Sequence, residues 1–164
     1  MDYLQVIQQK IIDATTLSKL VANYQLKNQS IVFTNGCFDL LHSGHVTYLA
    51  QAASLGNRLI VGINSDSSVQ KLKGKHRPVQ DEKSRCLIMA SLHVVSAVIL
   101  FEEDTPLELI KLIRPYFLVK GGDWEIDNIV GSTEVLSYGG QVKSIPFIDG
   151  FSTTAIESKI KSSN

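Results

Sequence analysis

Short apolar runs alternate with longer amphipathic stretches along most of this 164-residue chain. The apolar runs have the length and the Val, Ile and Phe content of strands. We predict five strands, at residues 30–34, 58–64, 96–101, 116–120 and 141–147. Between the first two strands, Val46, Leu49, Ala50 and Ala53 follow the i, i+3, i+4, i+7 spacing of an amphipathic helix over residues 45–55.

Further helices are predicted between the later strands and at both ends of the chain. They cover residues 3–26, with a break near 13–16, then 82–92, a segment ended by Pro115, a segment ended near Gly139, and a last helix from about 152–154. Continuously apolar strands that alternate with helices are typical of a parallel sheet covered on both faces. We therefore predict an α/β fold: a single Rossmann-like domain with a five-stranded parallel sheet and helices on both faces. Residues 1–27 are expected to form an N-terminal helical segment and residues 28–164 the main domain.

Composition narrows the class of protein. The chain has 16 basic and 16 acidic side chains, so its net charge does not favour nucleic acid or anionic membranes as partners. Two cysteines in a chain of this length do not form a disulfide framework. The N-terminus lacks the pattern of a signal peptide, and no apolar run approaches the roughly 20 residues of a membrane span. We expect a cytoplasmic protein.

Ligands of such sheets bind beyond the carboxyl ends of the strands, near a reversal of strand order. Four polar or glycine-rich segments follow predicted strands and are the places to look for chemistry. They are residues 34–45, 64–78, 120–124 and 148–154.

The first of these segments has the features of a phosphate site. Asn35-Gly36 turns the chain out of a strand, and a helix begins close to His45. The free N–H groups and the positive dipole end of that helix favour an anion. His42 lies three residues before His45, so the two rings fall on roughly one side of the first helical turn. Two other interpretations stay open here: a metal site that includes Cys37, although the spacing fits no common zinc pattern, and histidines with only a structural role.

The string GCFDLLHSGH resembles the H-x-G-H signature of the nucleotidyltransferase superfamily. The longer FTNGCFDLLHSGHVTYL, together with LKGKHRPV, FEEDTP, LVKGGDW, IVG and GFSTTAI, closely resembles the family of D-glycero-β-D-manno-heptose 1-phosphate adenylyltransferases in their stand-alone form. The resemblance covers about residues 28–160. It implies a nucleotidyltransferase domain that transfers AMP from ATP to the sugar phosphate with Mg²⁺, giving ADP-heptose and pyrophosphate. It also implies small-molecule partners only, with a homodimer as a further expectation.

The resemblance assigns roles to individual residues. His42, His45 and Lys73 are the expected catalytic residues. Residues expected to contact ATP or the sugar phosphate are Thr34, Asn35, Gly36, Cys37, Phe38, Gly44, Arg77, Gly121, Asp123, Ser152, Thr153 and Thr154. Lys75 and Arg85 are further candidates from the same basic stretch, which taken alone also fits a solvated loop. Asp39 either helps to place Mg²⁺ or holds its loop by accepting backbone N–H bonds.

One departure from the family pattern bears on activity. Ser96 stands where the family often has Asp. It leaves open a nucleotide-binding module without turnover. A cytidylyltransferase acting on glycerol 3-phosphate or a similar alcohol phosphate also stays open, because it shares the H-x-G-H signature and the sequence does not separate adenine from cytosine.

Overall fold

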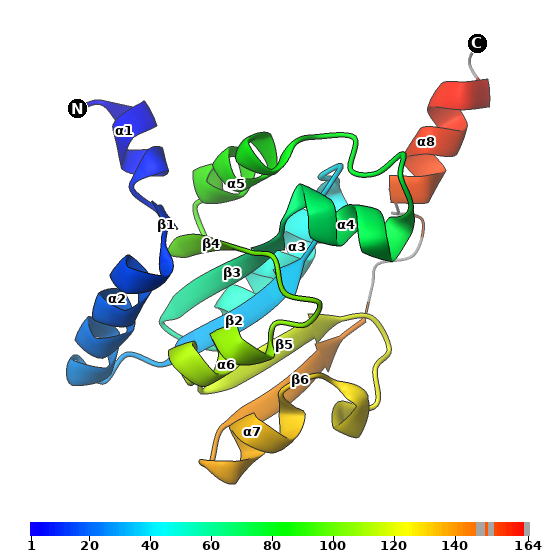
Figure 1. Ribbon diagram of the computed structural model, residues 1–164. Helices are drawn as coiled ribbons and strands as arrows, with labels where there is room; N and C mark the ends of the chain where they lie inside the picture. Colours follow the sequence, from blue (N-terminus) through cyan, green and yellow to red (C-terminus); the bar gives the residue numbers. More distant parts are fainter. Residues whose placement is uncertain (147–149, 151–152, 163–164) are drawn as a thin grey trace.

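The strands form one parallel sheet with six members. The computed structural model describes residues 1–146, 150 and 153–162, without the side chains of residues 154, 155 and 161. The order across the sheet is β1-β4-β3-β2-β5-β6, and every neighbouring pair is parallel (Figure 1). The strands are β1 (Ile11–Ile12), β2 (Ile31–Gly36), β3 (Arg58–Asn64), β4 (Ala97–Phe101), β5 (Phe117–Gly121) and β6 (Gln141–Ile145).

The predicted fold class is confirmed, but the predicted number of five strands is wrong. The additional strand is β1, whose two residues pair with Val98 and Ile99 at the edge of the sheet. It interrupts the helix expected over residues 3–26, and it lies before the break expected near residues 13–16. A strand of two residues is too short to produce an alternating pattern, so the sequence gives no local signal for it.

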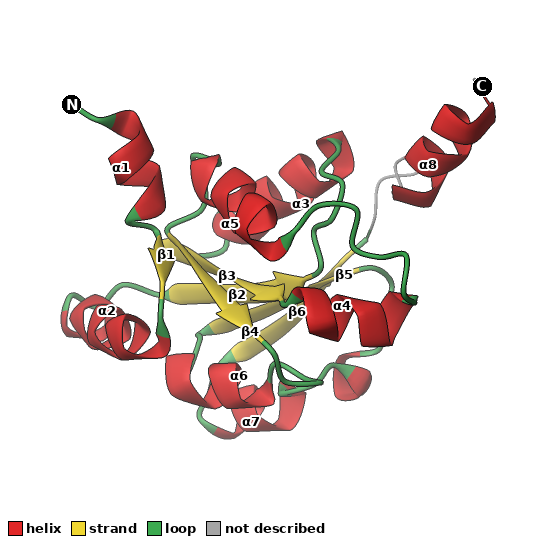
Figure 2. Ribbon diagram, turned by 45° about the horizontal axis from the view of Figure 1, so that its top comes forward, coloured by secondary structure: helices red, strands yellow, loops and turns green. Residues whose placement is uncertain are grey.

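Helices cover both faces of the sheet, as Figure 2 shows. One face packs against α2, α6 and α7 through a cluster that includes Leu17, Ile110 and Val135. The other face packs against α3 and α5 through Leu49 and Met89. The helices are α1 (Tyr3–Gln8), α2 (Ala14–Leu26), α3 (Ser43–Ala53), α4 (Asp66–Lys73), α5 (Glu82–Ser91), α6 (Leu107–Ile113), the 3₁₀ helix η1 (Ile126–Asn128), α7 (Ser132–Ser137) and α8 (Thr153–Ser162).

Helix α4 occupies part of the segment that the sequence indicated only as polar and basic. Ser65 caps it by accepting a hydrogen bond from the N–H of Ser68. Asp66 lies in its first turn and Lys73 in its last, which suits the helix dipole. Its buried residues are Ser68 and Val69, so no apolar stripe indicated a helix.

The strand order reverses between β2 and β5. The chain proceeds from β2 to β3 and β4 on one side and then returns to place β5 and β6 on the other. Loops therefore diverge above the carboxyl ends of β2 and β5, and this is where α/β sheets of this kind bind ligands. None of the helices in the described part of the chain has the length and apolar character needed to span a membrane.

Candidate active site

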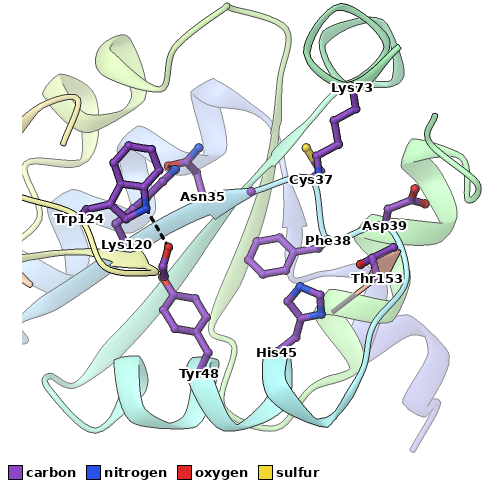
Figure 3. A pocket seen from close by; sticks show the side chains of 12 residues that line it. Asn35, Cys37, Phe38, Asp39, His45, Tyr48, Lys73, Lys120, Trp124 and Thr153 are labelled. Carbon is purple, nitrogen blue, oxygen red and sulfur yellow. Dashed lines mark hydrogen bonds between the residues drawn. The ribbon is translucent and has the colours of Figure 1, made fainter. Parts of the chain in front are cut away.

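A cavity of about 350 Å³ opens at the carboxyl ends of β2 and β5 (Figure 3). Its lining comes from three helices, two strands and the loops after them. The lining residues are Asn35, Gly36, Cys37, Phe38, Asp39, His45, Tyr48, Lys73, Lys120, Gly121, Trp124 and Thr153. A hollow of about 480 Å³ beside β1 and β4 is larger, but its charged lining residues are Asp13 and Glu103, which do not suit a phosphate. The cavity at the strand reversal is therefore the candidate active site.

His45 reaches the cavity from the first turn of α3. Its ring stacks on that of His42 with 3.9 Å between ring centroids and meets the ring of Phe38 edge-on at 5.5 Å. Burial lowers the pKa of His45 to about 4, and the positive charges of His42 and Lys73 act in the same direction. Its buried Nδ1 has no hydrogen-bond partner among the residues that the structure describes. At neutral pH His45 is therefore an uncharged ring at the wall of the cavity, with its Nδ1 buried.

The depressed pKa of His45 predicts a pH dependence of stability. The unfolded chain binds this proton near pH 6.5 and the folded chain only near pH 4, so stability falls as the pH drops between these values. Between pH 7 and pH 5, His45 lowers the free energy of unfolding by at most about 2 kcal/mol. This is an upper limit because solvent screens a partly exposed ring. Urea unfolding of the wild type and of His45→Gln at both pH values measures it. A wild-type loss no larger than that of the variant would contradict the depressed pKa.

His42 and Gly44 lie beside the cavity and are not part of its lining. His42 is the N-cap residue of α3, and its carbonyl accepts the N–H of His45 at 3.0 Å. Burial lowers its pKa as well. Gly36 does line the cavity, and a Cβ there would stand 3.0 Å from the ring of Phe38. Glycine at this position thus leaves room for the Phe38 ring to lie against His45. The backbone of Phe38 is in the left-handed region, with a φ of +44°.

The structure separates the basic residues into two groups. Lys73, the last residue of α4, lines the cavity with an exposed side chain. Arg77 instead pairs with Asp39, its Nε lying 2.9 Å from Oδ2, and with Glu157 of α8. Arg85 is 1 % exposed and donates to the carbonyl of Cys37 at 2.6 Å, to Asp66 at 2.8 Å and to the carbonyl of Gln80 at 3.1 Å. Arg77 and Arg85 thus hold loops in place here, and neither lines the cavity as Lys73 does.

The carboxylate of Asp39 holds the loop that follows α4. Asp39 is 3 % exposed, and its oxygens accept the N–H groups of Val79 and Gln80 at 2.9 Å in addition to pairing with Arg77. Within residues 1–146, 150 and 153–162, no group of three or more His, Cys, Asp or Glu side chains is placed to hold a metal ion. The contacts favour the loop-holding role of Asp39 over Mg²⁺ coordination.

We expect Asp39→Asn to lower the free energy of unfolding by about 3 kcal/mol, because it breaks a buried ion pair and removes one hydrogen-bond acceptor. Urea unfolding without nucleotide or Mg²⁺ measures this, with Asp104→Asn as the control at an exposed carboxylate. In an activity assay the Mg²⁺ concentration at half-maximal rate should not change. A stable variant that needs far more Mg²⁺ would instead make Asp39 a metal ligand.

Thr34 supports the cavity from below. It is fully buried, and its hydroxyl lies 2.6 Å from the hydroxyl of Tyr48, which also donates to the carbonyl of Val119 at 3.3 Å. These contacts tie α3 to β2 and β5 three residues after His45. Tyr48 was missed by the sequence analysis, although its place three residues after His45 puts it on the same helix face.

The end of β5 brings one expected residue and two others to the cavity. Gly121 lines it, and its carbonyl accepts the indole N–H of Trp124 at 3.0 Å. Lys120 also lines it and was not anticipated; its place at the carboxyl end of a strand was the available signal. Asp123 is exposed and is not part of the lining.

The segment around α8 contributes Thr153, the first residue of that helix, to the lining. Ser152 and the side chain of Thr154 lie outside the described residues. Ser96, the departure from the family pattern, immediately precedes β4 at the amino edge of the sheet, and its N–H donates to the carbonyl of Leu59. This position is on the edge of the sheet opposite the cavity.

Comparison with known proteins gives the following matches. The family model described as cytidylyltransferase-like matches residues 33–164. The chain is similar to the bifunctional protein HldE of Trichlorobacter lovleyi (54 % identical over 151 residues, 92 % of this chain and 31 % of the relative). It is also similar to HldE of Caulobacter vibrioides (50 % identical over 153 residues, 93 % of this chain and 32 % of the relative). The chain thus spans about a third of the length of these curated relatives.

Two solved structures also match this chain. A lipopolysaccharide core biosynthesis protein from Thermoplasma volcanium matches with a TM-score of 0.60 and 30 % identity, over 73 % of this chain and 97 % of that protein. A pantoate–β-alanine ligase from Francisella tularensis, in complex with beta-gamma ATP and β-alanine, matches with a TM-score of 0.61 over 92 % of this chain and 76 % of that protein. At 16 % identity, the second match shows a common fold alone.

Proposed function

Because the chain belongs to the cytidylyltransferase-like family and is a nucleotidyltransferase, we propose that it transfers AMP from ATP to D-glycero-β-D-manno-heptose 1-phosphate. The products are ADP-heptose and pyrophosphate. The observation that carries the proposal is the convergence of His45, Lys73 and Thr153 on one cavity at the strand reversal. The choice of a heptose phosphate rests on the family-specific strings and on the similarity to HldE and to a lipopolysaccharide core biosynthesis protein.

The chemistry requires positioning and charge stabilisation. The sugar-phosphate oxygen is already anionic, so it attacks the α-phosphorus of ATP in line without a protein nucleophile. Uncharged His45 donates a hydrogen bond to an α-phosphate oxygen as negative charge grows there, and His42, stacked on it, supports the same group. Lys73 supplies positive charge beside His45.

The leaving pyrophosphate is assigned to the start of α8. Thr153 lines the cavity there, and the free N–H groups at a helix N-terminus favour anions. Ser152 and Thr154 are proposed to take part as neighbours of Thr153. Mg²⁺ is proposed to enter as the MgATP complex, as part of the substrate, because the carboxylate nearest the cavity is committed to Arg77 and to backbone N–H groups.

The nucleoside is assigned to the end of β5. Gly121 carries no side chain that would keep a ligand away from the backbone. The indole of Trp124 is 48 % exposed while its N–H is held by the carbonyl of Gly121, so its face is available for stacking against a ring. Asp123 is exposed and is proposed to accept hydrogen bonds from ribose hydroxyls at the rim. A reaction that uses ATP and sugar phosphates fits a cytoplasmic protein.

One alternative keeps the chemistry and changes the substrates. The matching family is described as cytidylyltransferase-like, which favours CTP with an alcohol phosphate such as glycerol 3-phosphate. A binding module without turnover has less support, since Ser96 lies at the edge of the sheet opposite the cavity.

Pyrophosphate release with Mg²⁺ separates these functions. ATP and CTP are each combined with heptose 1-phosphate and with glycerol 3-phosphate. Release only from ATP with the heptose phosphate is the expected result. Release from CTP with glycerol 3-phosphate would support the alternative, and no release from any pair, with ATP still bound, would support a binding module.

A further inference from the structure

The cavity contains a second cation that the mechanism above does not use. Arg77 and Arg85 do not line it and are committed to protein carboxylates and carbonyls. Lys73 and Lys120 both line the cavity and make no ion pair with a carboxylate among the described residues. They come from different elements, the end of α4 and the end of β5. Two cations are therefore available to substrate anions.

The surroundings of Lys120 favour an anionic ligand. Its Nζ donates to Oδ1 of Asn35 at 3.4 Å, which is longer than a strong charge-assisted bond. Burial lowers the pKa of Lys120, and the neighbouring Cys37 acts weakly in the opposite direction. A desolvated ammonium with one long bond to a neutral amide is incompletely stabilised. A phosphate oxygen at the mouth of the cavity would complete its hydrogen bonding.

The position of Lys120 indicates which phosphate it binds. In Figure 3, Lys120 and Asn35 lie on one side of the His45 ring, and Thr153 lies on the other. In-line transfer places the incoming oxygen and the leaving pyrophosphate on opposite sides of the α-phosphorus. With pyrophosphate at Thr153 and the α-phosphate at His45, the incoming phosphate lies on the side of Lys120.

We propose that Lys120, oriented by Asn35, binds the phosphate of the acceptor sugar phosphate and holds its attacking oxygen toward the α-phosphorus of ATP. An acceptor oxygen forms a bond to the α-phosphorus while the bond from that phosphorus to the bridging oxygen of the β-phosphate breaks. Both electrons of the broken bond leave with pyrophosphate, and Lys120 keeps its protons. This assignment rests on the proposed function and adds to it a residue that selects a phosphorylated acceptor.

The test replaces Lys120 with Met, which keeps the length of the side chain and removes the charge, and with Arg, which keeps the charge. Lys143→Met is the matched control, because Lys143 is exposed on neighbouring β6 and does not line the cavity. Thermal unfolding confirms that each variant is folded. For Lys120→Met we expect KM for the acceptor to rise about 10- to 100-fold, the effect of one charge-assisted hydrogen bond, with partial recovery in Lys120→Arg. The Kd of α,β-methylene-ATP, measured by calorimetry, should stay within about twofold of wild type.

An unchanged acceptor KM in Lys120→Met would overturn the assignment. An equal loss of affinity for the ATP analogue would overturn it too, since Lys120 would then bind the nucleotide. Calorimetry with heptose 1-phosphate and with inorganic phosphate separates this result from a failure of the proposed function. If the wild type releases no pyrophosphate, weaker phosphate binding by Lys120→Met than by Lys143→Met still supports an anion site at Lys120. Equal binding, or no binding by the wild type, overturns it.

Discussion

Alanine in place of His45 is expected to lower kcat about 10²–10³-fold while the protein stays folded. The ring lies in the lining, is uncharged at neutral pH and has a buried nitrogen without a partner among the described residues. Because negative charge grows on the α-phosphate in the transition state, the proposed hydrogen bond from His45 is strongest there, and its loss should affect kcat and kcat/KM together. Steady-state pyrophosphate release with saturating ATP measures the effect.

His93→Ala is the control for this variant, because His93 is exposed in the loop between α5 and β4. His42→Ala is expected to show a loss of similar order, through the ring that stacks on His45. Near-normal turnover in either His42→Ala or His45→Ala, with a normal thermal unfolding curve, would remove that histidine from the mechanism.

Leucine in place of Arg85 is expected to lower the free energy of unfolding by about 3–5 kcal/mol. The guanidinium is buried and makes hydrogen bonds to the carbonyls of Cys37 and Gln80 and to the carboxylate of Asp66. Leucine leaves these three acceptors without their donor, and it separates the loop of Cys37 from the start of α4. Urea unfolding measures the effect, and Lys83→Leu, at an exposed position on the same helix, is the control.

Arg85→Leu also decides between two roles for the basic stretch after β3. A destabilised protein whose remaining folded fraction binds ATP normally would confirm a structural arginine. A variant as stable as wild type that has lost its affinity for phosphate would mean that Arg85 turns toward substrate.

The sheet was predictable because its buried strands are continuous apolar runs that need no long-range information. β1 and α4 were not predictable from such patterns. Residues 11–12 form a strand only because β4 offers a free edge, and α4 is held by a cap and terminal charges around two buried residues. Both elements depend on contacts with other parts of the folded chain, which the local sequence pattern does not show.

The candidate site was predictable where backbone position determines exposure to the cavity. Asn35 and Gly36 end β2 and His45 lies in the first turn of α3, and the fold brings such positions to the carboxyl edge. Whether Arg77 and Arg85 contact substrate or protein carboxylates could not be predicted. It depends on which carboxylates lie within reach in the folded chain. Lys120 lies in the segment 120–124 that the sequence indicated, but it was not selected because a lone lysine near the end of an apolar strand gives no motif.

We propose that this cavity joins AMP to a sugar phosphate by attack of a sugar-phosphate oxygen on the α-phosphorus. Heptose 1-phosphate labelled with ¹⁸O in its phosphate group tests this most directly, with ATP and Mg²⁺ and with mass spectrometry of both products. We expect ADP-heptose that carries all of the label and pyrophosphate that carries none. Label in pyrophosphate, or the absence of ADP-heptose while ATP and the sugar phosphate both bind, would contradict it.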